Sequence, residues 1–395
     1  MPKLKELTEV GGAFLRLGLT SFGGAFAHLA YFRKEFVERR RWLDDAAYAD
    51  IVALCQFLPG PASSQVVFAL GMRRAGVAGA LTGSLCFMLP SAVLMIAFGY
   101  GIYSLGDLRH VGWLHGLRLA AVAVVAAAAW DMSFRLCPDW QRRILAAAST
   151  AAVLLLSGAA WQVGAIAGCA LAGVWIYRGR DTPDGPAPAG FTRGHAWAAA
   201  SLALFALLIF LLPALAAVGR ERSVEMFDGF YRVGSLVFGG GHVVLPLLRS
   251  VVVPPGWITD DAFLAGYGAA QALPGPLFTF AGFLGTAITR GDHAWMGGLI
   301  GLFAIFLPAW LLVGGTYPFW HLLRSRTWAQ SALDGINAAV VGILVAALYR
   351  PLCTENVATP RDAAAVVAAF LLAKLGTPPW ALVALMAAFG QWILR

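Results

Sequence analysis

Residues 56–61 read Gln-Phe-Leu-Pro-Gly-Pro, and residues 271–276 read Gln-Ala-Leu-Pro-Gly-Pro. A second shared stretch lies upstream of each copy, FLRLGLTSFGG at Phe14–Gly24 and FYRVGSLVFGG at Phe230–Gly240. Both pairs are separated by about 215 residues, so the chain is a tandem duplication. Glycine and proline interrupt apolar segments at matching places in the two halves. Such paired interruptions are the best sequence indication of a binding site in a membrane carrier.

The composition places the chain in a membrane. Hydrophobic residues make up 59% of the sequence and charged residues 13%, and the mean hydropathy is +0.72. A soluble domain carries about 25% charged residues. The net charge of +8 is explained by arginines in cytoplasmic loops, so no nucleic-acid partner is expected.

Apolar runs of about 20 residues, the length that spans a bilayer, recur along the chain. We expect an all-α polytopic protein with about 10–13 membrane segments, some of them broken or re-entrant. The expected segments are 8–30, 46–72, 76–104, 111–134, 141–157, 160–177, 196–218, 223–247, 260–286, 293–322, 330–350, 359–375 and 378–394.

Three parts follow from the duplication: a first repeat at 1–177, a linker with an unpaired helix at 178–222, and a second repeat at 223–395. Basic residues crowd the loops after the first two segments of the first repeat, and the matching loops of the second repeat are mixed or acidic. Positive charge marks the cytoplasmic side. The two repeats are therefore predicted to have inverted orientations.

The same rule raises a conflict at segment 46–72, because basic loops flank both of its ends. A simple spanning helix would place one of these loops outside the cell. We interpret the segment as re-entrant, turning at its Leu-Pro-Gly-Pro element, with a kinked full span as the alternative.

The Pro-Gly-Pro turns leave backbone groups without helical partners, which lipid tolerates only beside protein or a water-filled cavity. The half-helix that follows the first turn would direct free N–H groups and its positive dipole end at the membrane interior. Such a place favours an anion, and the alternative is a structural kink. The candidate residues here are Gln56, Pro59, Gly60, Pro61, Ser63, Ser64 and Gln65, with Gln271, Pro274, Gly275 and Pro276 in the second copy.

Arg16 and Arg232 each lie six residues before Phe-Gly-Gly, in apolar segments, and no carboxylate recurs beside both. An always-charged guanidinium suits an oxyanion, and the alternative is an interfacial anchor. Arg118 is interpreted in the same two ways. The remaining candidates near the breaks are Gly23, Gly24, His28, Gly239, Gly240 and His242, of which the histidines could carry a proton or donate to an anion.

No Walker A motif, clustered Cys/His set or paired intramembrane carboxylates occur in the sequence. We therefore expect no enzyme activity, no metal and no cofactor. A membrane enzyme acting on lipid-linked substrates and a sensor without transport are the alternatives of other classes.

The stretches FGGAFAHLAYFRKEFVERRRWL and YADIVALCQFLPGPASSQ resemble the chromate transporter family in its long two-domain form. The stretches FGGGHVVLPLL and QALPGPLFTFAGFLG resemble its second domain. Ala25 stands where the family pattern leads us to expect proline. The resemblance implies a multi-pass protein of the bacterial inner membrane that exports chromate and lowers its toxicity. Sulfate is the alternative substrate or competitor, because it is also a tetrahedral dianion, and homodimer formation is left open.

Overall fold

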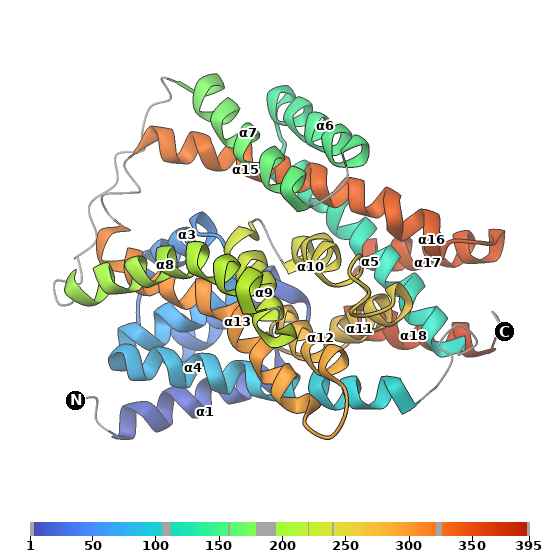
Figure 1. Cartoon of the computed structure of the whole chain (residues 1–395). Coiled ribbons are helices and arrows are strands. Elements are labelled where there is room, and N and C mark those ends of the chain that lie inside the picture. Colours follow the sequence, from blue (N-terminus) through green and yellow to red (C-terminus); the bar gives the residue numbers. More distant parts are fainter. Residues whose placement is uncertain are drawn as a thin grey trace. The chain divides into compact units, whose positions relative to one another are not determined.

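The computed structural model describes residues 4–104, 112–156, 159–178, 195–219, 221–238, 241–320 and 326–392 (Figure 1). Every regular element in these ranges is a helix. A helix satisfies its own backbone hydrogen bonds, which is what a lipid environment requires. The predicted all-α polytopic fold class is confirmed. The predicted linker at Asp181–Gly190 lies outside the described residues.

The first repeat supplies seven α-helices and one π-helical turn in the described residues. They are α1 (Leu4–Thr20), α2 (Gly24–Arg33), η1 (Lys34–Arg39), α3 (Asp45–Phe57), α4 (Ala62–Ser104), α5 (Gly112–Leu136), α6 (Trp140–Leu155) and α7 (Ala159–Ile176). The predicted segment 8–30 is therefore not one helix, because it breaks between Thr20 and Gly24. Helix α4 is interrupted at Ala75-Gly76, where segments 46–72 and 76–104 were predicted to meet.

The unpaired helix α8 (His195–Gly219) joins the two repeats, as predicted for 196–218. The second repeat consists of α9 (Arg222–Leu236), η3 (Gly241–Val243), α10 (Val244–Val252), α11 (Asp260–Gln271), η4 (Leu277–Thr279), α12 (Phe280–Thr289), α13 (Ala294–Thr316), η5 (Tyr317–Phe319), α15 (Thr327–Ala347), η6 (Leu348–Cys353), α16 (Thr354–Asn356), α17 (Pro360–Lys374) and α18 (Pro379–Trp392). Within the predicted segment 223–247, helix α9 ends at Leu236, before the second Phe-Gly-Gly element.

Among the described residues, five helical spans are long and apolar enough to cross a membrane: Ala62–Ile102, Gly112–Leu136, Ala196–Gly219, Ala294–Phe319 and Thr327–Arg350. Shorter apolar helices lie at Trp161–Ile176, Gly241–Val252 and Leu277–Thr289. Large apolar side chains of α8 such as Phe210 are mostly exposed, as lipid contact requires. The chain is a multi-pass membrane protein.

The helices gather into two compact units, and neither unit is one repeat. The first unit contains Met1–Tyr100, Thr182–Gly241 and Pro274–Arg326, and the second contains Gly101–Asp181, His242–Leu273 and Thr327–Arg395. Each unit therefore takes helices from both repeats. The repeat boundaries predicted from the sequence stay a prediction about the duplication, and the compact units divide the chain differently.

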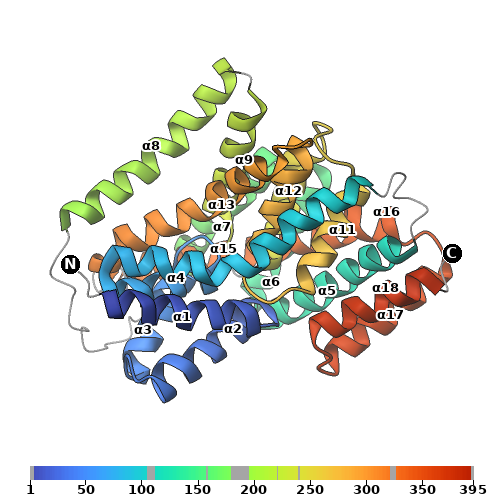
Figure 2. The ribbon, with the colours of Figure 1, turned by 90° about the horizontal axis from the view of Figure 1, so that it is seen from below.

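The second unit shows how the repeats interleave. Helix α15 packs against α6 and α7 of the first repeat (Figure 1), and α5 packs against α17 and α18 of the second repeat (Figure 2). Matching glycines allow the close approach. A Cβ at Gly335 would collide with the carbonyl of Cys169, and a Cβ at Gly116 would collide with that of Met386. Each repeat thus exchanges its last two helices with the other, as an approximate twofold relation requires.

The same relation governs the first unit. A Cβ at Gly18 would collide with the carbonyl of Phe87, and a Cβ at Gly234 would collide with that of Ile305. Helix α1 therefore lies against α4 in the way that α9 lies against α13. The direction of this twofold relation relative to the membrane, and with it the inverted orientation of the repeats, stays a prediction.

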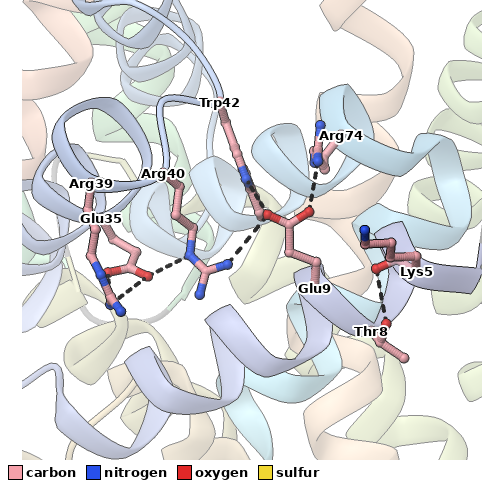
Figure 3. A network of polar contacts seen from close by, with 8 residues as sticks. All are labelled: Lys5, Thr8, Glu9, Glu35, Arg39, Arg40, Trp42 and Arg74. Carbon is pink, nitrogen blue, oxygen red and sulfur yellow. Dashed lines mark hydrogen bonds and ion pairs between the residues drawn. The ribbon is translucent and has the colours of Figure 1, made fainter.

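Figure 3 shows Glu9 of α1 between Trp42 and Arg74, which lie on either side of the predicted segment 46–72. Its carboxylate accepts hydrogen bonds from Trp42 Nε1 at 2.9 Å and from Arg74 at 2.7 Å, and Arg40 lies at 3.5 Å. The guanidinium of Arg74 also lies 5.5 Å from the ring centre of Trp42. Trp42 precedes α3, and Arg74 ends the first part of α4. The chain between them therefore turns back on itself, and re-entry of this segment from one side of the membrane stays a prediction.

The basic stretch after α2 forms part of the same network. Glu35 accepts hydrogen bonds from Arg40 at 2.6 Å and from Arg39 at 3.0 Å. Burial alone would raise the pKa of the Glu35 carboxyl, but the bonds from Arg40 and Arg39 outweigh it and lower that pKa. The carboxylate therefore stays charged and fixes this loop.

Candidate functional site

The first Phe-Gly-Gly element is a true break between α1 and α2. Gly23 has a φ of +98° and Gly24 a φ of +77°, a left-handed conformation that glycine adopts without steric cost. The break forms although Ala25 replaces the expected proline. The corresponding Gly239 and Gly240 lie outside the described residues, and α9 ends just before them, at Leu236.

The two Leu-Pro-Gly-Pro elements are also breaks with left-handed glycines. Gly60 has a φ of +127° and Gly275 a φ of +95°. A Cβ at Gly60 would lie 2.7 Å from Gln65 Nε2 and 3.1 Å from the Cβ of Ala309. A Cβ at Gly275 would lie 2.9 Å from Ser91 Oγ. Backbone conformation and space therefore both require glycine at these two turns.

The breaks of the two repeats are joined crosswise within the first unit. The Gly60 N–H donates to the carbonyl of Val237 at 2.6 Å, and the Gly275 N–H donates to the carbonyl of Ser21 at 2.9 Å. Ser21 and Val237 hold the same place in the duplicated sequence, one residue before Phe-Gly-Gly. Each Pro-Gly-Pro turn thus meets the broken helix of the other repeat.

At the first turn, the start of α4 is buried, and some of its backbone and side-chain hydrogen-bond donors have no partner. Ser63 and Ser64 are each 4% exposed, and Gln65 is fully buried. The first-turn N–H groups of a helix have no acceptor within it. Ser64 Oγ also has no hydrogen-bond partner, whereas Gln65 Nε2 donates to the Pro59 carbonyl at 2.7 Å. This helix end presents uncommitted donors to a polar ligand.

At the second turn the equivalent donors are already bound. A 3-10 turn, η4, precedes α12, and the Thr279 N–H donates to the carbonyl of Pro276 at 3.1 Å. Thr279 Oγ1 donates to the same carbonyl at 2.8 Å. Leu277 and Phe278 replace small and polar residues of the first copy. At the second turn the donors of Thr279 are therefore already bound within the turn. The two half-sites are predicted to be unequal, and the two turns differ in their free hydrogen-bond donors.

Ser21 and His28 add polarity where Gly275 meets α1. His28 is 1% exposed, and its Nε2–H donates to the Ser21 carbonyl at 3.2 Å. His28 Nδ1 and Ser21 Oγ are buried without a partner. A neutral ring with Nε2–H has a lone pair at Nδ1, so His28 can donate to an anion only after it gains a proton. The places equivalent to Ser21 and His28 in the second repeat hold Val237 and Val244.

Three other candidates have different surroundings. Gln56 is exposed at the end of α3. His242 and Gln271 belong to the second compact unit. There His242 Nδ1 lies 2.9 Å from the Tyr267 hydroxyl, and Gln271 Nε2 is buried without a partner.

The arginines differ from the expectation of unpaired cavity-facing charges. Arg16 is exposed and forms no ion pair among the described residues, which favours an interfacial anchor. Arg232 is not unpaired, because it forms an ion pair with the buried carboxylate of Asp228 one helical turn earlier. The i,i+4 spacing of this pair was visible in the sequence.

Arg118 is paired as well. It contacts Asp261 of α11 and, through NH2, His115 Nδ1 at 3.1 Å. Sequence reasoning did not identify Asp261 or His115 as functional residues. Asp261 lies 143 positions from Arg118, and no local pattern links positions so far apart.

Comparison with known proteins agrees with this architecture. The family model described as "Chromate transporter" matches residues 8–174 and 224–391, so the chain belongs to the chromate transporter family. It is 28% identical over 375 residues to the chromate transport protein of Cupriavidus metallidurans, covering 91% of this chain and 86% of that protein. It is 27% identical to the chromate transport protein of Pseudomonas aeruginosa, covering 87% and 80%. No solved structure matches the chain.

Proposed function

We propose that this protein is a secondary transporter that exports chromate across the bacterial inner membrane and so gives chromate resistance. The observation that carries the proposal is the crosswise joining of the helix breaks through Gly60–Val237 and Gly275–Ser21. Irregular backbone at membrane depth is tolerated only where it is buried in protein or lines a water-filled cavity. Paired discontinuous helices of this kind form the substrate sites of many secondary carriers.

The chromate dianion would bind at the first-repeat turn. Free N–H groups at the start of α4, the dipole of that helix and the uncommitted Ser64 hydroxyl all favour negative charge. The second turn contributes the backbone contact of Gly275 but few donors. One carrier would thus hold one dianion, bound mainly by residues of its first repeat.

The membrane potential is sufficient to drive export. Moving two negative charges out of a cell that is about 100 mV negative inside releases about 4–5 kcal/mol. ATP is therefore not required. Sulfate has the same charge and shape, and a hydrogen-bonding site separates such isosteres poorly. We expect it to compete with chromate, and a homodimer is compatible with this mechanism without being required by it.

The direct test is uptake of labelled chromate into inside-out membrane vesicles that contain the protein. Uptake should exceed that of empty vesicles, fall when the membrane potential is collapsed and fall with excess sulfate. The variant Gly12→Leu is a matched control, because a Cβ at Gly12 would meet nothing within 4 Å. Sulfate uptake without chromate uptake would make the chain a sulfate carrier. Absence of both would refute the proposal.

A further inference from the structure

Four side chains of the second unit form a continuous polar chain that the proposed anion site does not use. Asp261 of α11 contacts Arg118 of α5, and Arg118 NH2 lies 3.1 Å from His115 Nδ1. On the other side of the ring, His115 Nε2 lies 2.8 Å from Asp362 Oδ1 of α17. The chain Asp261–Arg118–His115–Asp362 therefore ties three helices together.

The geometry fixes the protonation state of His115. A guanidinium can only donate hydrogen bonds, so Nδ1 must accept and carries no proton. The ring proton then sits on Nε2 and is donated to Asp362. Asp362 is 4% exposed at its side chain and also accepts the backbone N–H of Thr359 at 2.9 Å, which keeps it ionised and in place. The contact between Arg118 and His115 exists only while His115 is neutral.

The charges leave room for one more proton. Two carboxylates, one guanidinium and a neutral imidazole sum to −1, and the adjacent Arg249–Asp260 pair leaves that sum unchanged. His115 is 22% exposed at its side chain, so water can reach it. Other elements packed on α5 bring few charges. Helix α18 carries none, and the remaining charged residues are Asp334 on α15, Arg350 on η6, and Arg361 and Lys374 on α17.

The second repeat contains the same contact with its polarity reversed. Asp334 holds the place of His115, because Leu-Asp-Gly at 333–335 aligns with Leu-His-Gly at 114–116. Arg142 and Asp362 are each the third residue of their helix, α6 and α17. Arg142 NH2 lies 3.0 Å from Asp334 Oδ2. This counterpart is a permanent ion pair between an arginine and an aspartate, so only the first contact contains a histidine, which can be neutral or protonated.

We propose that the chain Asp261–Arg118–His115–Asp362 is a proton-binding site. A proton from water adds to His115 Nδ1, the hydrogen bond from Arg118 is lost, and the imidazolium keeps its bond to Asp362. Repulsion between the imidazolium and the guanidinium one turn away displaces Arg118 and weakens its contact with Asp261, so the tie between α11 and α17 through α5 opens. The inference rests on the proposed function only in that the loosened helices belong to a carrier.

The test uses hydrogen exchange of the purified full-length protein without chromate, at pH 7.5 and pH 5.5, corrected for intrinsic exchange rates. In the wild type, amides at the start of α11 should exchange about tenfold faster at the lower pH, the loss expected for one charge-assisted hydrogen bond. Asp334→Asn is the matched control and should respond like the wild type. His115→Gln should show no pH response.

A second variant protects the test against misfolding. The double substitution His115→Asp with Asp362→Arg installs the ion pair of the second repeat in the first contact. It should fold and exchange at a rate that does not change between the two pH values. A wild type without pH response, or an unchanged response in both His115 variants, overturns the inference. Because chromate is absent, either result leaves the proposed export function untouched.

Discussion

The turns at Leu58–Pro61 and Leu273–Pro276 share one sequence motif and a glycine with positive φ. They differ in the hydrogen-bond donors that are free to bind a ligand. Each donates its glycine N–H to the broken helix of the other repeat. The first opens into a helix start with the unpartnered Ser64 hydroxyl, whereas the second binds Thr279 to its own Pro276 carbonyl. After duplication, backbone geometry was kept and side-chain chemistry diverged. From two structurally equivalent breaks we therefore expect one anion site.

The largest effect is expected where the two turns are alike. Gly60→Leu and Gly275→Leu should each reduce vesicle chromate uptake by more than about 100-fold. Both residues have a positive φ that costs a side chain about 1–3 kcal/mol, and both lack space for a Cβ. Membrane insertion and the elution volume of the purified protein should match those of Gly12→Leu. If either folded variant takes up chromate at the wild-type rate, the turns are structural kinks and do not form the binding site.

A smaller effect should separate the two turns. Ser64→Ala should raise the KM for chromate about tenfold, since a hydrogen bond to a charged group contributes about 1.5–3 kcal/mol. Thr279→Val should change KM less than about twofold, because its hydroxyl is already committed to Pro276. Thermal unfolding of both variants checks that they fold. Equal KM changes in the two variants would show that the turns bind the anion equally.

The smallest effects concern Arg16 and Arg232, which hold the same place in the two repeats. Arg232→Gln should destabilise the protein by about 1 kcal/mol, because it leaves the buried Asp228 carboxylate unpaired, and Asp228→Asn should restore the loss. Arg16→Gln should change stability by less than about 0.5 kcal/mol and leave chromate affinity nearly unchanged. The measurements are thermal unfolding and vesicle KM. A strong loss of chromate affinity in Arg16→Gln would show that Arg16 contributes to the anion site.

The sequence predicted the structural features that depend on a few consecutive residues. Gly23-Gly24 and the Leu-Pro-Gly-Pro elements identify the breaks, because glycine and proline have conformations that other residues avoid. Charge at both ends of segment 46–72 predicts its return to one side of the membrane, and Glu9 contacts Trp42 and Arg74 at its two ends.

The interleaving of the repeats could not be read from the chain. The bonds from Gly60 to Val237 and from Gly275 to Ser21 involve backbone atoms, which every residue possesses. Arg118 was identified as a candidate, but its partner Asp261 is remote in sequence and has no counterpart in the first repeat, where the equivalent position is Ala46. Pairing of this kind is decided by tertiary packing and leaves no local pattern.

The exchange of helices between repeats has a consequence for how the protein is made. Helices α6 and α7 pack on α15, which begins at Thr327, 151 residues after α7 ends at Ile176. At about 5–20 residues per second, a ribosome needs on the order of 10–30 s to reach α15 after completing α7. During that interval the newly inserted pair lacks its partner, and the surface that packs on α15, which includes Gly173, faces lipid. A nascent chain that stalls before residue 327 therefore leaves this surface open to membrane proteases and to pairing with another copy.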